Sequence, residues 1–189
     1  MTDTITIDWV KNFKMYALIV IAFSTFWAFS SRNPVVSNTD VAAAPREGFP
    51  APDFTLNTLD GSEITLSALR GKIVVINIWA SWCPPCRAET PALQNSYEQY
   101  KDLGVIILGV NLTNQDTLSA IKIFVQDFNL TYPILLDEEG KAASLYQNMA
   151  LPSTYFIDRE GIIRTVIIGG PMSETLIQSK IETLLKERP

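Results

Sequence analysis

The sequence predicts a single α/β domain in which strands and helices alternate and the strands form a covered sheet. Residues 72–79, KIVVINIW, are a continuous β-branched run of the kind found in a strand buried on both faces. A helical pattern at 84–101, a second apolar run at 105–110 and a helical pattern at 116–128 follow it. Because parallel strands need a crossover between them, this order implies parallel pairing with helices covering the sheet.

A short antiparallel unit precedes this alternation. Residues 54–59 and 62–66 alternate apolar and polar side chains on either side of the dipeptide Asp60-Gly61. Alternation about such a dipeptide predicts a β-hairpin at the start of the domain. A short helical turn that ends at Gly71 then leads into the buried strand.

The C-terminal third predicts smaller elements of both kinds. A second hairpin is expected about the sequence DREG, and a capped helix closes the chain. The expected elements are a strand at 134–136, a helix at 139–147, hairpin strands at 154–157 and 162–168, and a helix at 173–186.

Composition excludes several classes of function. The chain has 189 residues, a net charge of −5 and no basic stripe, so nucleic acid is not expected as a partner. Histidine is absent, which removes the usual general base and the most frequent zinc ligand. With only two cysteines, a structural zinc site would lack two of its customary ligands.

The N-terminal part predicts a membrane-directed segment. Residues 15–31, MYALIVIAFSTFWAFSS, carry no charge and follow a short tail at 1–14. This run suits an anchor at the lower limit of spanning length, although Ala28-Phe29-Ser30 also offers a signal-peptide cleavage site. We expect a retained anchor, a linker at 32–50 rich in Ala, Pro, Ser and Asn, and a folded domain at 51–189.

The candidate chemistry lies in Cys83 and Cys86, within Trp82-Cys-Pro-Pro-Cys directly after the predicted buried strand. A cysteine at a strand-to-helix junction lies beside unpaired helix N–H groups, which stabilise a thiolate. We therefore expect Cys83 to be an exposed nucleophile, and Cys86, one turn along and more buried, to resolve the mixed disulfide. Pro84 and Pro85 suit the first helical turn and remove N–H donors that would otherwise stabilise sulfur. No cofactor beyond the Cys83–Cys86 disulfide is expected.

Residues 73–91, IVVINIWASWCPPCRAETP, resemble the active-site region of thioredoxin-like proteins of the TlpA/ResA/CcmG type. The similarity extends from about Ala51 to the C-terminus and includes the APDFTL entry shared with the wider redoxin superfamily. The resemblance implies a thioredoxin-like fold, with a central mixed sheet flanked by helices and the N-terminal hairpin as an addition.

Two further site residues are implied by matching positions. Pro152 matches the proline that is cis in this fold and faces the two cysteines across the substrate groove, where the Leu151 backbone would pair with an extended substrate. Glu89 matches an acidic residue that moves protons or tunes the second cysteine in the family, and a solvated helix carboxylate is the alternative. Asn77 stands where thioredoxin itself has a buried Asp. Trp79 and Trp82 are expected to frame the cysteines or to pack in the core.

The resemblance implies an enzyme that reduces disulfides in exported proteins, with cytochrome c maturation as the associated process. Its domain would lie on the extracytoplasmic side, and a transmembrane reductase of the CcdA/DsbD type would supply electrons. The surface around Pro152 and the segment at 112–117 are expected to determine substrate specificity.

Other functions remain as alternatives. A disulfide oxidase or isomerase differs from a reductase in potential rather than in fold. A peroxiredoxin is disfavoured, because Ala80 stands where the peroxidatic signature has a Thr. A non-catalytic binding module needs no reactive cysteine, and copper delivery of the related type uses a CxxxC spacing with a distant His, both absent here.

Overall fold

The structure, a computed structural model, describes residues 42–187. The predicted tail at 1–14, the membrane segment at 15–31 and the larger part of the linker lie outside the described residues. Within the described range, none of the helices combines the length and the apolar character that crossing a membrane requires.

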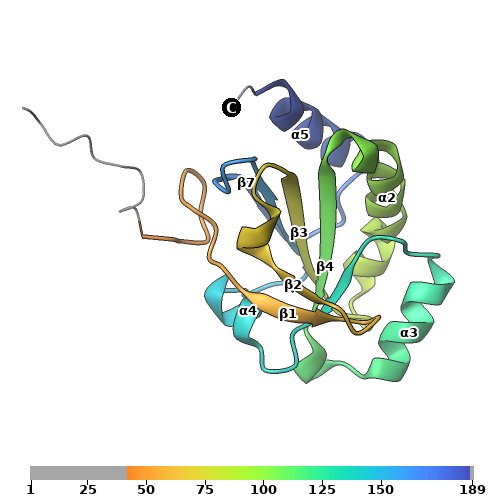
Figure 1. Ribbon diagram of the computed structural model, residues 1–189. Helices are drawn as coiled ribbons and strands as arrows, with labels where there is room; N and C mark the ends of the chain where they lie inside the picture. The colour runs from red at the N-terminus through yellow and green to blue at the C-terminus, as the bar shows by residue number, and fades with distance from the viewer. Residues whose placement is uncertain (1–41, 188–189) are drawn as a thin grey trace, which may run out of the picture. The chain divides into compact units, whose positions relative to one another are not determined.

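A seven-stranded mixed sheet forms the centre of the domain (Figure 1). The pairs β3–β4 and β4–β5 are parallel, as the strand–helix alternation predicts, whereas the other pairs are antiparallel. In spatial order the strands are β2 (Glu63–Thr65), β1 (Thr55–Thr58), β5 (Ile134–Leu136), β4 (Val105–Asn111), β3 (Ile73–Trp79), β6 (Ser153–Ile157) and β7 (Ile163–Ile168).

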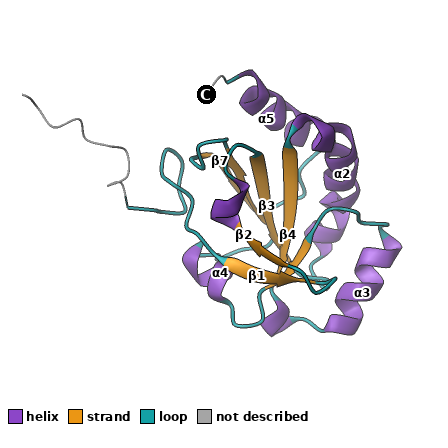
Figure 2. Cartoon of the chain, viewed as in Figure 1, coloured by secondary structure: helices purple, strands orange, loops and turns teal. Residues whose placement is uncertain are grey.

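Helices cover both faces of the sheet, and each face has its own hydrophobic core (Figure 2). Alternate residues of β3 enter the two cores, so that Ile73 and Val75 face one and Val74 and Ile76 face the other. The first core includes side chains of α2 (Pro84–Tyr100), α3 (Leu118–Asp127) and α5 (Glu174–Lys186); the second includes side chains of the 3₁₀ turn η2 (Leu66–Leu69) and α4 (Lys141–Leu145). Two further 3₁₀ turns, η3 (Lys101–Leu103) and η4 (Thr113–Gln115), flank β4.

Two helices are shorter than the sequence predicts. Helix α3 begins at Leu118 because Thr117 is its N-cap, and the carboxylate of Asp116 is bound to Ser81 instead. Helix α4 begins at Lys141 because Gly140, which precedes it, has a left-handed backbone with φ of +69°. Both differences lie in loops between strands and helices.

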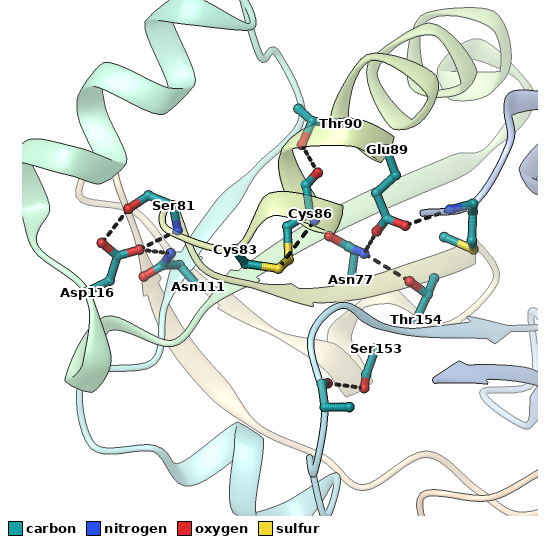
Figure 3. Close-up of a disulfide and its surroundings, with 12 residues drawn as sticks. Asn77, Ser81, Cys83, Cys86, Glu89, Thr90, Asn111, Asp116, Ser153 and Thr154 are labelled. Carbon is teal, nitrogen blue, oxygen red and sulfur yellow. Dashed lines mark hydrogen bonds between the residues drawn. A yellow bond between two sulfur atoms is a disulfide. The ribbon is translucent and has the colours of Figure 1, made fainter. Parts of the chain in front are cut away.

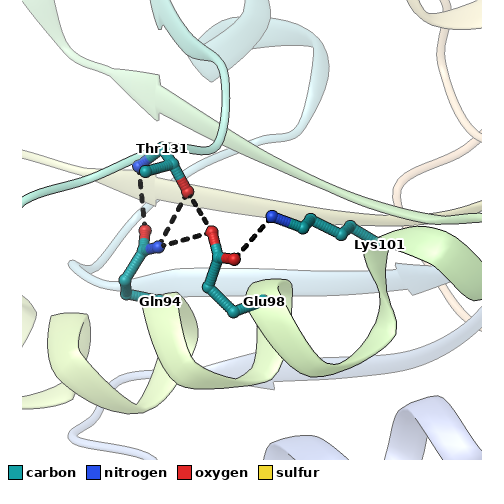
Figure 4. A network of polar contacts seen from close by, with 4 residues as sticks. All are labelled: Gln94, Glu98, Lys101 and Thr131. Atoms are coloured by element: carbon teal, nitrogen blue, oxygen red, sulfur yellow. Dashed lines mark hydrogen bonds and ion pairs between the residues drawn. The ribbon is translucent and has the colours of Figure 1, made fainter.

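A polar network fixes α2 to the loop before β5 (Figure 4). Gln94 exchanges two hydrogen bonds with Thr131, at 2.8 and 3.0 Å, and Glu98 accepts a hydrogen bond from the Thr131 hydroxyl. Lys101 donates to the other oxygen of Glu98. The network holds the C-terminal half of α2, so the position of the helix does not rest on apolar packing alone.

The last part of the predicted linker belongs to the folded domain. Gly48 N–H donates to the Ile163 carbonyl and Ile163 N–H donates to the Phe49 carbonyl, at 2.8 and 2.9 Å. The Glu47 carboxylate accepts from Val166 N–H at 3.0 Å. The segment therefore covers the outer edge of β7, whose backbone groups need partners, and the ordered domain begins before the predicted boundary at Ala51.

We expect a chain that begins at Ala51 to be less stable than one that begins at Ala42. The shorter chain loses the three hydrogen bonds to β7, which together contribute about 2 kcal/mol to the free energy of unfolding. Urea unfolding of the two chains measures the difference. Equal unfolding midpoints and slopes would show that the segment contributes nothing to the fold.

Candidate active site

The two cysteines lie at the start of α2, close to the end of the central strand β3 (Figure 3). Cys83 is the N-cap residue, and its Sγ accepts a hydrogen bond from Cys86 N–H at 3.3 Å. A disulfide joins the two residues, whose Cα atoms are 5.3 Å apart. The helix N-terminus that the motif predicts is therefore present, and the N–H of Cys86 donates to the sulfur of Cys83.

Access to the cysteines differs from the prediction. The sequence predicts an exposed Cys83, but Cys83 is only 3% exposed and Cys86 is 1% exposed. Neighbouring loops surround Cys83, so it is reached through a groove of about 440 Å³, whose lining does not include Cys86. All the lining residues are uncharged: Trp82, Cys83, Pro84, Pro85, Leu112, Gln115, Asn148, Met149, Ala150 and Leu151.

The loop before β6 forms the opposite wall of this groove. The Leu151–Pro152 peptide bond is cis, as the resemblance implies. The Ser153 hydroxyl donates to the Ala150 carbonyl at 2.7 Å and so joins the two ends of the loop. Leu151 lines the groove as predicted, whereas Pro152, which the resemblance places across the groove from the cysteines, is buried and is not one of its lining residues.

Glu89 lies fully buried on α2, one turn after Cys86, which decides against a solvated helix carboxylate. One carboxylate oxygen accepts from Asn77 Nδ2 at 2.8 Å, and the other accepts from Met172 N–H at 3.0 Å. Asn77 also donates to the Thr154 hydroxyl at 2.9 Å. A chain of hydrogen bonds thus links β6, β3, α2 and the segment before α5, and satisfies polar groups that burial would otherwise penalise.

The electrostatics of Glu89 are dominated by its burial. Loss of water raises the pKa of its carboxyl, and the hydrogen bonds from Met172 and Asn77 offset this only in part. Burial also raises the pKa of Tyr132, and the negative charge of Glu89 adds to that effect. A carboxyl with a raised pKa can exchange a proton closer to neutral pH than a solvated one.

Gly170 allows the site to close around Glu89. A Cβ atom at this position would lie 2.7 Å from Glu89 Oε2 and 2.7 Å from Pro152 Cγ. Gly169 N–H donates to the Pro152 carbonyl at 2.8 Å. The segment after β7 is therefore packed directly against both the buried acid and the cis proline.

The two tryptophans near the cysteines have different roles. Trp79 is buried, and its ring packs against Phe124 with centroids 4.3 Å apart, so it belongs to the core. Trp82 is 55% exposed and lines the groove beside Cys83. The sequence alone allows both interpretations for each of them.

Several contributors to the site were not singled out from the sequence. Asp116, Thr154 and Met172 act through contacts with residues far away in the chain. Asp116 has a sequence signal of its own, as the acidic first residue of the predicted helix at 116–128, but that pattern is typical of any helix N-terminus. Within residues 42–187, no group of three or more Cys, Asp or Glu side chains is placed to bind a metal ion.

A family model matches the part of the chain that contains this site. The model of the AhpC/TSA family matches residues 48–166. The chain belongs to the AhpC/TSA family. The matched region contains the cysteine pair, Glu89 and Pro152, and begins within the segment that covers β7.

Several similar proteins are named as thiol-disulfide oxidoreductases or thiol:disulfide interchange proteins. Thiol-disulfide oxidoreductase ResA of Oceanobacillus iheyensis is 35% identical over 162 residues, which cover 83% of this chain and 80% of that protein. The crystal structure of a DsbE-type thiol:disulfide interchange protein from Chlorobium tepidum has a TM-score of 0.68 and 28% identity, covering 74% of this chain and 98% of that one. A secreted disulfide oxidoreductase of Mycobacterium tuberculosis, homologous to Escherichia coli DsbE, has a TM-score of 0.64 and 27% identity, with coverage of 69% and 96%.

These similarities establish the fold and the type of chemistry. The domain has the thioredoxin-like α/β fold, and the enzyme is a thiol-disulfide oxidoreductase of the ResA and DsbE type. Within residues 42–187 the only cysteines are the disulfide-bonded pair at the N-terminus of α2.

We expect the stability of the enzyme to depend on the protonation of Glu89. Because its pKa is raised in the folded state, stability from this group is present at low pH and is lost as pH rises from the usual carboxyl pKa to the raised one. Glu89→Gln keeps the position neutral. The unfolding free energy of Glu89→Gln should therefore increase relative to that of the wild type as pH rises through that interval. The increase is about 1.4 kcal/mol for each tenfold difference in proton affinity between the folded and unfolded states.

Urea unfolding of both proteins between pH 4 and pH 9, about the range that carboxyl titrations of this kind span, measures the difference. Glu63→Gln, at an exposed position in β2, serves as the control and should follow the wild type. A constant gap between Glu89→Gln and the wild type at every pH would contradict a raised pKa.

Proposed function

We propose that this oxidoreductase is anchored to a membrane by residues 15–31 and reduces disulfide bonds in exported proteins, for example during cytochrome c maturation. Its redox domain would lie on the extracytoplasmic side of the membrane, and a transmembrane thiol reductase of the CcdA/DsbD type would supply its electrons. The uncharged run at 15–31 and the resemblance to ResA support this placement.

Access to the sulfur atoms supports a defined order of steps. The Cys83 thiolate attacks one sulfur of a substrate disulfide, a mixed disulfide forms, and the first substrate sulfur leaves as a thiolate that takes up a proton. The Cys86 thiolate then attacks Cys83 Sγ, which breaks the mixed disulfide and releases the second substrate thiol. Two electrons pass to the substrate, and the Cys83–Cys86 disulfide forms. Cys83 has the first role because it lines the groove and Cys86 does not.

Glu89 is suited to accept the Cys86 proton in the second step. It lies one turn after Cys86 on the same helix, and its raised pKa favours proton uptake. Asn77 takes the place of the relay carboxylate of thioredoxin and donates a hydrogen bond to Glu89. The proton route of this enzyme would therefore begin on α2 rather than on β3.

The small number of N–H donors at Cys83 is the observation that favours a reducing role. Pro84 and Pro85 have no N–H, so the hydrogen bond at Cys83 Sγ comes from Cys86 N–H. A strongly oxidising pair owes its potential to a well-stabilised reduced form. With fewer donors the thiolate is stabilised less, which favours a low potential and hence a reductant.

The reduction potential of the Cys83–Cys86 pair tests this direction. We expect a value of about −250 mV or lower, toward the roughly −270 mV of thioredoxin, when the protein is equilibrated in graded thiol/disulfide buffers and free thiols are counted. A value near roughly −120 mV would point to disulfide insertion instead. Failure to form the intramolecular disulfide would reject the dithiol mechanism altogether.

Substitution of each cysteine tests their order. Cys86→Ser should trap a mixed disulfide between Cys83 and a protein substrate, because the resolving thiol is missing. Cys83→Ser should trap none and should lose at least about 1,000-fold in rate, as expected for removal of a nucleophile. Non-reducing electrophoresis after reaction with an oxidised protein detects the adduct. Trapping through Cys86 in the Cys83→Ser protein would reverse the assignment.

A further inference from the structure

Asp116 binds the loop that leads into the cysteine motif (Figure 3). One of its carboxylate oxygens accepts from Ser81 N–H at 2.7 Å, and the other accepts from the Ser81 hydroxyl at 2.6 Å. Ser81 is two residues before Cys83, whereas Asp116 lies 35 residues further along the chain, between β4 and α3. The carboxylate thus joins two loops that meet beside the groove.

The Asp116 carboxylate is itself held in place on both oxygens. Asn111 Nδ2 donates to one oxygen at 3.0 Å, and Thr117 N–H donates to the other at 2.8 Å. Partial burial alone would raise the pKa of Asp116, but the hydrogen bonds from Ser81, Asn111 and Thr117 outweigh it and lower the pKa. The carboxylate is therefore charged and has four donors of defined position.

Trp82 is attached to the same β4–α3 loop. Its indole N–H donates to the Gln115 carbonyl at 2.8 Å, and both residues line the groove beside Cys83. More than half of the indole is exposed, so apolar packing does little to fix it. Its orientation depends on the hydrogen bond to Gln115 and on the loop that carries Ser81.

We infer that Asp116 is a positioning residue, which holds the Ser81 loop so that Trp82 forms a fixed wall of the groove that receives a protein substrate. This inference rests on the proposed function only in taking the groove as the substrate site. Asp116 makes no hydrogen bond to Cys83, Cys86 or Glu89, and the N–H of Cys83 donates to the Ala80 carbonyl instead. Its effect is on substrate binding rather than on sulfur chemistry.

Asp116→Asn tests the inference, because it keeps the size of the side chain and brings an NH₂ donor against the donors of Ser81 or Asn111. In the full chain, with dithiothreitol as electron donor and insulin as disulfide substrate, KM should rise about 5- to 10-fold, the effect of one lost hydrogen bond. The value of kcat should stay within about two-fold. Asp102→Asn, at an exposed position away from the groove, is the matched control and should leave both parameters unchanged.

A double-mutant cycle separates positioning from loss of stability. If Asp116 acts through Trp82, then adding Asp116→Asn to Trp82→Ala should change KM by less than about two-fold. If the two effects multiply, Asp116 acts on the fold in general and the inference is overturned. Should Asp116→Asn not fold, Ser81→Ala removes one of the two hydrogen bonds and should change KM in the same direction by less.

Hydrogen exchange of the Trp82 indole N–H gives a readout independent of catalysis. Its exchange rate in Asp116→Asn should rise about 10-fold, because the loop that orients the ring is released. An unchanged rate would overturn the inference even if KM rises. A wild-type protein that does not reduce insulin would count against the proposed function, whereas the exchange rate would still decide whether Asp116 positions Trp82.

Discussion

The burial of strand β3 is the constraint on which the rest of the structure depends. All seven of its residues are buried, and it has a parallel partner on one edge and an antiparallel partner on the other. Its last residues therefore lie beside the end of β4 and the start of β6, in the registers Trp79↔Asn111 and Ile78↔Ser153. The cysteine loop, the β4–α3 loop and the cis-proline loop meet at this one end of the sheet because of that pairing. Ligand sites of open α/β sheets occupy the same position, beyond the carboxyl ends of the parallel strands.

The carboxyl of Glu89, buried on α2 beside this strand, would be costly without hydrogen bonds. Donors from two elements other than α2 compensate for that cost. Asn77 reaches Glu89 from β3 itself, and Met172 N–H reaches it from the segment before α5. The arrangement leaves Glu89 satisfied but still harder to ionise than a carboxyl in water. Such a carboxyl contributes little to stability, and in the proposed mechanism it would exchange a proton with the neighbouring Cys86.

Local pattern predicted the features that depend on neighbours in the chain. The buried strand before the cysteines, the helix that begins at Pro84 and the parallel pairing of β3 with β4 all follow from periodicity and spacing. The resemblance added the cis peptide at Pro152. The burial of Glu89 and Cys83 was not predictable, because it depends on loops far along the chain: Leu112 borders the groove at Cys83, and Met172 donates a hydrogen bond to Glu89. The start of α3 was missed for the same reason, since the partner of Asp116 is Ser81 rather than its own helix.

The absence of a side chain at Gly170 has a consequence for how this site can change in evolution. Glu89 and Pro152 both occupy the space that a Cβ would need, so this one position contacts the buried carboxyl and the cis-proline loop together. Any larger residue there would displace both at once. A substitution at Gly170 is therefore expected to change the proton affinity of Glu89 and the position of the cis-proline loop together.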